Sequence, residues 1–134
     1  MFEDIQLMHA HYGITKFIKS ADTQTKKHYL DFRLGFIKEE YTELVKAYQS
    51  KDSNELVDAL IDILVVTIGT LDTLGIDIDK AWDDVYKANM SKFIGENKKR
   101  TYKMEGLPDL VKPEGWTAPD HSNNIGDLDE IFNS

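Results

Sequence analysis

The sequence predicts an all-α protein, a four- to five-helix bundle with two antiparallel carboxylate-bearing helices, assembled as an oligomer. Two observations lead to this prediction. Apolar residues recur at intervals of three and four through residues 3–95, which is the period of amphipathic helices. The 134 residues are the size of one ordinary domain, with no alternating strand pattern beyond residues 102–104. We therefore expect a single helical domain over residues 1–134, with its helical core at about 3–95.

The first two helices follow from this spacing. One is expected over residues 3–19, where Gly13 weakens its middle. The second is expected from Thr23 to Tyr48, because its apolar residues keep to one face throughout. At about seven turns it is long.

The third helix is predicted over residues 53–74. The polar segment before it is rich in helix-capping types, and Gly75 is a typical stop. Its apolar residues lie on most sides, so it should be buried on all sides. That burial could be central in one subunit or across a subunit interface.

The remaining elements are a fourth helix and an irregular tail. Asp77 or Asp79 should cap a helix that reaches about Phe93. Residues 96–134 contain glycines and prolines at loop spacing and should form a strap across the helices. Four apolar residues near the end could dock a short helix. They are Ile125, Leu128, Ile131 and Phe132.

Composition limits the partners and the compartment. The formal net charge of −8 disfavours non-specific binding to nucleic acid or to an anionic membrane. The longest apolar stretch, Ile61–Thr70, is interrupted by Asp62 and is too short to cross a bilayer. The chain has no cysteine, and its start lacks the features of a secretory signal. A cytoplasmic protein is the expectation.

Six carboxylates on the second and third predicted helices form the candidate site. They are Glu39, Glu40 and Glu43, followed after a short break by Glu55, Asp58 and Asp62. At about 100° per residue, each group of three occupies less than a third of its helix circumference. A short connection makes the two helices antiparallel, so the two groups should face each other.

Carboxylates among core residues are costly unless a cation compensates them. Oxygen ligands alone indicate Mg²⁺, Mn²⁺ or Ca²⁺. The alternative is that these residues are ordinary solvated side chains. A di-iron site would need E-x-x-H motifs, which this sequence lacks, and its four scattered histidines are expected to be structural or at the surface.

The pattern E-E-x-x-E, then E-x-x-D on the next helix, resembles the MazG-like, all-α nucleoside triphosphate pyrophosphohydrolase superfamily. That superfamily includes dimeric dUTPases and phosphoribosyl-ATP pyrophosphohydrolases. Residues 75–93 are similar to its fourth-helix signature, and residues 112–119 to a tail in phosphoribosyl-ATP pyrophosphohydrolase-like members. The resemblance implies Mg²⁺-dependent hydrolysis of a nucleoside triphosphate to a monophosphate and pyrophosphate, with Mn²⁺ as a possible substitute.

The resemblance also implies roles for individual residues. Glu40, Glu43, Glu55 and Asp58 would hold Mg²⁺, and Glu39 would assist a further metal or deprotonate the attacking water. The chain is then expected to be a homodimer or a tetramer. Phosphoribosyl-ATP hydrolysis and a non-catalytic metal-binding or oligomerisation module remain as alternatives.

Further residues could contact the substrate. Asn89 and Lys92 are three apart and can share one helix side, offering an amide and a cation to phosphate, although Lys92 could simply be a cation at a helix C-terminus. Asp62, Lys98 and Arg100 are weaker candidates; the basic pair could instead belong to a solvated linker. Four aromatic residues could stack on a base or belong to the core. They are Trp82, Tyr86, Phe93 and Trp116.

Overall fold

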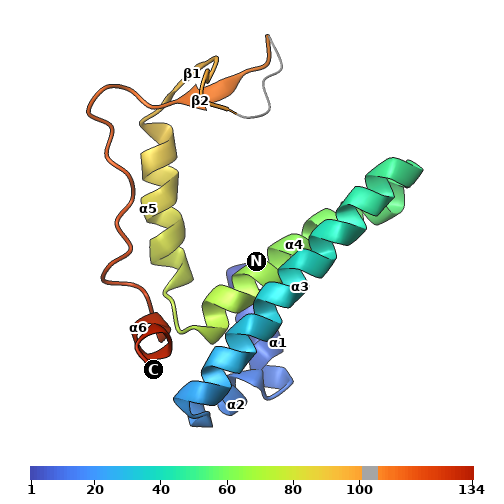
Figure 1. The fold of residues 1–134 in the computed structure, drawn as a ribbon, viewed down its shortest axis with the longest axis vertical. Coiled ribbons are helices and arrows are strands. Elements are labelled where there is room, and N and C mark those ends of the chain that lie inside the picture. The colour runs from blue at the N-terminus through green and yellow to red at the C-terminus, as the bar shows by residue number, and fades with distance from the viewer. Residues whose placement is uncertain (101–105) are drawn as a thin grey trace. The chain divides into compact units, whose positions relative to one another are not determined.

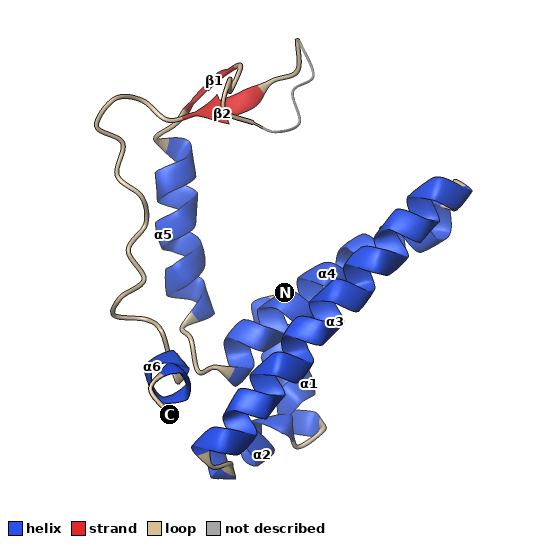
Figure 2. Ribbon diagram, viewed as in Figure 1, coloured by secondary structure: helices blue, strands red, loops and turns tan. Residues whose placement is uncertain are grey.

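The computed structural model describes residues 1–100 and 106–134. The described residues form mainly helices with one small two-stranded sheet, which confirms the all-α class (Figure 2). The helices are α1 (Phe2–His11), α2 (Ile14–Ser20), α3 (Thr23–Ser50), α4 (Ser53–Thr73), α5 (Ile78–Met90) and α6 (Leu128–Phe132). The strands are β1 (Phe93–Gly95) and β2 (Asp109–Val111). The chain divides into two compact units, residues 1–78 with 124–134, and residues 79–123.

The predicted first helix is two helices, α1 and α2, and the expectation of one continuous helix over residues 3–19 is wrong. Gly13 has a φ of 76° and is the N-cap of α2. This left-handed conformation is accessible to glycine at little cost and ends the regular helix. Gly13, the residue that weakened the prediction of one continuous helix, is therefore the position where the helix breaks.

The long helix α3 and its successor α4 begin where capping side chains predict. The Asp22 carboxylate accepts a hydrogen bond from the Thr25 N–H at 2.8 Å. The Thr25 side chain, and then this backbone hydrogen bond, lower the pKa of Asp22. Asp52 caps α4 in the same way, accepting from the Glu55 N–H at 3.1 Å. Between the helices, Lys51 adopts the left-handed conformation with a φ of 57°. The chain reverses there, and α3 and α4 lie side by side in antiparallel directions (Figure 1).

The core of the larger unit lies where α1 packs on the C-terminal half of α4. Ile5, Ile68 and Ile78 are buried together, with Phe2 and Leu71 against them. The N-terminal half of α4 and the C-terminal half of α3 extend past α1 and α2 (Figure 1). The C-terminal half of α4 therefore packs on both α1 and α3, whereas its N-terminal half packs on α3 and lies beyond α1 and α2.

A buried polar network accompanies this core. His9 is almost fully buried, and its Nδ1 lies 2.6 Å from the Asp72 carboxylate. The Arg33 guanidinium is also buried and donates to the Thr70 hydroxyl at 3.3 Å. A Cβ at Gly69 would lie too close to the end of the Arg33 side chain and 3.1 Å from the His9 ring, so a larger residue here would displace Arg33 from its hydrogen bonds. His9 is thus a structural histidine, as expected.

The exposed half of α4 departs from the prediction of burial on all sides. Four of its apolar side chains are between 44% and 63% exposed. They are Val57, Leu60, Ile61 and Leu64. Central burial within one subunit is wrong for this half of the helix, and the interface alternative remains.

The C-terminal segment docks on the larger unit through α6, as expected from its apolar residues. Ile131 is 2% exposed, whereas Phe132 is 71% exposed and does not serve as the expected anchor. Lys26 of α3 forms ion pairs with Asp127 at 3.2 Å and with Glu130 at 3.7 Å. These contacts hold the chain end against the start of α3.

The smaller unit contains a hairpin that the prediction of an irregular strap missed. β1 and β2 pair antiparallel, with Phe93 opposite Val111 and Ile94 opposite Leu110. The helix α5 ends at Met90 and not at about Phe93 as predicted, and Phe93 is instead the first residue of β1. The strand pattern noted at residues 102–104 lies outside the described residues.

Among the described residues, no single helix is long and apolar enough to cross a membrane; α4 and α5 taken together meet that test by length and composition only.

Candidate functional site

Five of the six predicted carboxylates gather between the extended halves of α3 and α4; we call them the acidic group. They are Glu39, Glu40 and Glu43 of α3, and Asp58 and Asp62 of α4. Glu40 and Asp62 are half-buried, whereas the other three are exposed. The helical stripes predicted from the sequence therefore do face each other.

Glu40 is the most unusual member of the acidic group. Its Oε2 is buried and has no hydrogen-bond partner in the part of the chain that the structure describes. Burial is the largest cause that raises the pKa of Glu40 above its ordinary value. Four neighbouring charges raise this pKa further. They come, in decreasing order, from Glu43, Asp62, Glu39 and Asp58.

Glu55 stands apart from this group. It is exposed in the first turn of α4, and it is not one of the four carboxylates that raise the pKa of Glu40. Within residues 1–100 and 106–134, no three acidic, histidine or cysteine side chains are close enough together to hold a metal ion as they stand. Mutual repulsion among like charges favours such a spread arrangement.

The chemistry of the acidic group nevertheless fits a hard divalent cation. Its donors are all carboxylate oxygens, which Mg²⁺ and Mn²⁺ prefer. A buried carboxylate oxygen without a donor is costly, and a cation would satisfy Glu40 Oε2 directly. The donor chemistry of these residues is thus compatible with Mg²⁺, which stays a prediction.

Asn89 and Lys92 lie close together, Asn89 in the last turn of α5 and Lys92 just after the helix, so the two do not share a helix side as predicted. The Lys92 ammonium donates to the Asn89 side-chain oxygen at 3.0 Å. Lys92 itself follows the helix, in the turn that leads to β1. This pair presents a cation whose position is set by a neighbouring amide.

Comparison with known families decides the enzyme class. Residues 14–89, more than half of the chain, match the family described as phosphoribosyl-ATP pyrophosphohydrolase. The chain belongs to this family. It is therefore a pyrophosphohydrolase that acts on phosphoanhydride bonds, within the superfamily that its acidic motifs resemble. A search of curated proteins found no match.

The matched range of this pyrophosphohydrolase contains all six predicted carboxylates and ends at Asn89. Lys92, Lys98 and Arg100 lie beyond it. The family match therefore says nothing about these three residues, and only the structure of the smaller unit bears on their roles.

The two weaker basic candidates of the pyrophosphohydrolase differ in their surroundings. The Arg100 guanidinium donates to both Asp109 carboxylate oxygens, at 2.6 and 3.0 Å. This contact is the largest cause that lowers the pKa of Asp109. Arg100 is thus already paired with an anion of its own chain. Lys98 is exposed.

In the smaller unit, Trp116 lies close to both Lys92 and Lys112. The sequence analysis did not single out Lys112. The indole Nε1 donates to the Ala88 carbonyl in the last turn of α5 at 2.9 Å. The ammonium groups of Lys92 and Lys112 lie 5.0 and 4.9 Å from the indole ring centroid. Lys112 and Trp116 both belong to the stretch 112–119 whose resemblance to a family tail was noted, and that resemblance together with their four-residue spacing was the available signal.

The other three aromatic candidates in this unit are exposed, at 52% to 58% of their surface. They are Trp82, Tyr86 and Phe93. The expectation that aromatic residues here belong to the core is not met within the single chain.

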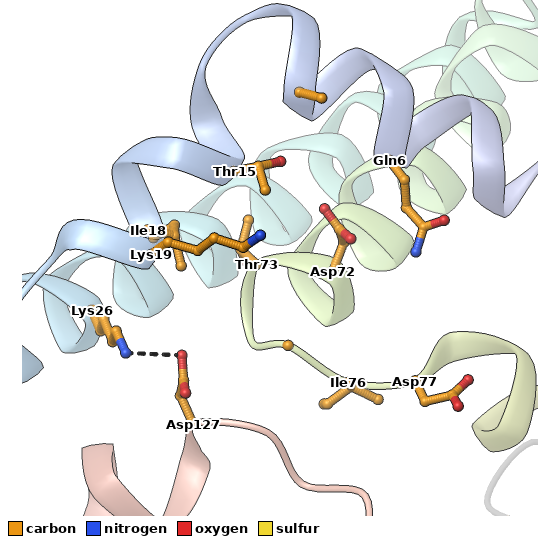
Figure 3. Close-up of a pocket in the computed structure, with 12 residues that line it drawn as sticks. Gln6, Thr15, Ile18, Lys19, Lys26, Asp72, Thr73, Ile76, Asp77 and Asp127 are labelled. Atoms are coloured by element: carbon orange, nitrogen blue, oxygen red, sulfur yellow. Dashed lines mark ion pairs between the residues drawn. The ribbon is translucent and has the colours of Figure 1, made fainter.

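A separate cavity of about 670 Å³ lies at the opposite end of α3 and α4 from the acidic group (Figure 3). Along α3, its residue Lys26 is about 20 Å from Glu40. Lys26 pairs there with Asp127, and this contact raises the pKa of Lys26. Asp72 is held by His9. Asp127 and Asp72 in this cavity thus each have a partner, unlike the Glu40 Oε2 in the acidic group.

Proposed function

We propose that this pyrophosphohydrolase hydrolyses nucleoside triphosphates to nucleoside monophosphates and pyrophosphate with the help of Mg²⁺. The observation that carries the proposal is the buried, unbonded Oε2 of Glu40 amid four other carboxylates. Such an arrangement is unfavourable by itself and is relieved by a divalent cation. A triphosphate brings the anionic oxygens that the same cation would bind.

Four carboxylates would hold the metal in this proposal. They are Glu40, Glu43, Glu55 and Asp58. When bound, Mg²⁺ would neutralise charge on the phosphate oxygens and favour ionisation of a nearby water. Glu55 is exposed on the first turn of α4, so its side chain would have to turn toward the acidic group.

Glu39 would orient the attacking water and accept its proton. It is exposed and next to Glu40 in the chain, so a water in reach of its carboxylate is accessible from solvent. The water oxygen forms a bond to the α-phosphorus, the bond from that phosphorus to the bridging oxygen breaks, and the bridging oxygen leaves with the electron pair as part of pyrophosphate. Asn89 and Lys92 would bind phosphate oxygens through their N–H groups.

Phosphoribosyl-ATP is the second candidate substrate, because the matching family carries its name. It contains the same type of phosphoanhydride bond, so the acidic group would serve both reactions. The two substrates differ only in what lies beyond the triphosphate.

The test is release of pyrophosphate with Mg²⁺, measured over the canonical and deaminated nucleoside triphosphates and phosphoribosyl-ATP. Glu40→Ala and Asp58→Ala should abolish release on every substrate while the helical circular dichroism spectrum stays unchanged. Asp31→Ala, which removes an exposed carboxylate of α3 outside the acidic group, should retain activity. Wild-type turnover in Glu40→Ala or Asp58→Ala would contradict the assignment. A melting temperature raised by Mg²⁺ without any turnover would indicate metal binding alone.

We also propose that the chain self-associates through the exposed apolar face of α4. Val57, Leu60, Ile61 and Leu64 form this face. Monomeric proteins rarely leave several large apolar side chains exposed together on one helix. In a symmetric dimer, the same apolar side chains of a second copy would pack against this face and bury it.

A further inference from the structure

The smaller unit gathers two lysines around one tryptophan, although the chain as a whole is acidic. The Lys92 and Lys112 ammonium groups lie 5.0 and 4.9 Å from the centroid of the Trp116 ring. The formal net charge of the protein is −8. Two like charges held at one ring repel each other, so this local arrangement is unusual for the chain.

The position of the ring is fixed by a hydrogen bond to α5. Trp116 Nε1 donates to the Ala88 carbonyl in the last turn of α5 at 2.9 Å, and the Ser91 hydroxyl donates to the same carbonyl at 2.7 Å. Trp116 is half-buried. The ring therefore ties the segment after β2 to the end of α5.

Both lysines keep donors available. Lys92 gives one N–H to Asn89, and an ammonium has three donors. Lys112 is exposed, and its recorded contact is with the face of the indole ring. A cation–π contact attracts an ammonium through its charge and leaves its N–H groups able to bind an anion.

We propose that Lys112 is a second phosphate-binding residue, which Trp116 positions beside Lys92, and that this pair within the smaller unit binds pyrophosphate groups. This inference rests on the proposed function and adds a residue outside the matched family range. Arg100 does not compete for this role, since Asp109 already engages it through two hydrogen bonds. The two lysines lie at most about 10 Å apart, which neighbouring phosphate groups can bridge with modest lysine movement.

Tryptophan fluorescence provides a binding measurement that does not depend on activity. The chain has two tryptophans, so Trp82→Phe leaves Trp116 as the only one. Inorganic pyrophosphate titrated into Trp82→Phe without metal should give a saturable change in emission. In Trp82→Phe/Lys112→Ala the affinity should fall at least tenfold, and Trp82→Phe/Lys112→Arg should recover most of it, because arginine keeps the charge and stacks on aromatic rings.

Trp82→Phe/Lys16→Ala is the matched control, since it removes an exposed lysine of α2 in the other unit. Its affinity for pyrophosphate should equal that of Trp82→Phe. Equal loss in both lysine variants would show that only overall charge matters and would overturn the proposal. Unchanged affinity in the Lys112→Ala variant, or no saturable signal in Trp82→Phe, would overturn it too.

Kinetics separate this role from a purely structural one. Lys112→Ala should raise KM for the triphosphate about tenfold and change kcat less than twofold, with an unchanged melting temperature. A lower melting temperature with unchanged KM would mean that Lys112 only holds Trp116 in place. Failure of the proposed reaction would appear as no pyrophosphate release by the wild type, and the fluorescence titration would still test anion binding.

Discussion

Glu40 is placed where its charge opposes folding. Its Oε2 is buried without a hydrogen bond, and neighbouring carboxylates add repulsion that an unfolded chain does not have. Groups that reduce stability in this way are typical of functional sites, where binding of a ligand offsets the cost. Neutralising Glu40 should therefore stabilise the metal-free fold, whereas neutralising other surface carboxylates should have little effect on its stability.

Glu40→Gln should raise the melting temperature of the metal-free protein at pH 7 by a few degrees while it removes activity. The pKa of Glu40 is raised in the folded state, so the native protein gains stability from this group as pH falls through that pKa. That gain is complete below the unfolded value of about 4.5. The difference between variant and wild type should consequently shrink between neutral pH and about 4.5. Thermal melts at several pH values measure it.

Asp31→Asn is the control for this charge change, and its melting temperature should follow the wild type at each pH. Adding Mg²⁺ should stabilise the wild type more than Glu40→Gln, because the variant lacks the anionic ligand. A variant that is less stable than the wild type at pH 7 would show that Glu40 has a structural role instead.

The sequence placed these carboxylates by angle but could not rank them. Helical spacing alone brought Asp62 into line with Asp58, and the pKa of Glu40 responds to both. Side-chain packing between α3 and α4 determines which carboxylate oxygen is buried away from solvent. The spacing of residues along a helix does not predict this packing. Lys112 was missed for a related reason: its proximity to Lys92 arises from the β1–β2 hairpin and the docking of Trp116.

At the level of elements, residues with positive φ separate successive helices. Gly13 separates α1 from α2, Lys51 separates α3 from α4, and Gly75 separates α4 from α5. The capping residues around the second break made it predictable, whereas an isolated glycine in an amphipathic segment is compatible with either a helix or a break. The chain reversal at Lys51 places the two carboxylate-bearing helices side by side, which the proposed metal site requires.

Lys51→Gly should stabilise the protein by about 0.5 to 1 kcal/mol without changing activity. Lys51 has a φ of 57°, and its N–H bonds to the α3 end at Tyr48. A side chain in this conformation carries strain that glycine avoids. Urea unfolding at constant m-value would measure the gain.

Lys46→Gly provides the opposite case on the same helix. Lys46 is exposed within α3, where glycine should cost about 1 kcal/mol. Equal destabilisation by both glycine substitutions would show that the conformation at Lys51 is not strained.

At the scale of the whole molecule, the exposed apolar face of α4 is the basis for the proposed self-association. The core of the larger unit lies around Ile5 and Ile68, while Leu60 and Ile61 are 49% and 52% exposed. Each large apolar side chain left in water forgoes roughly 1.5 to 3 kcal/mol of possible burial. The same helix carries Asp58 and Asp62 of the acidic group, so contact between copies would also remove water from the neighbourhood of the site.

Ile61→Glu should shift the protein toward the monomer, because a copy docked on this face would bury the new carboxylate and place it near its own symmetry mate. Light scattering after size-exclusion chromatography, at several protein concentrations, measures the shift. Leu107→Glu is the matched control, since Leu107 is 54% exposed in the other unit and should keep the wild-type mass. A monomeric wild type at high concentration would contradict association, and an unchanged mass for Ile61→Glu would move any interface elsewhere. If the monomeric variant also loses pyrophosphate release while the acidic group is intact, the catalytic unit is the assembled protein rather than the single chain.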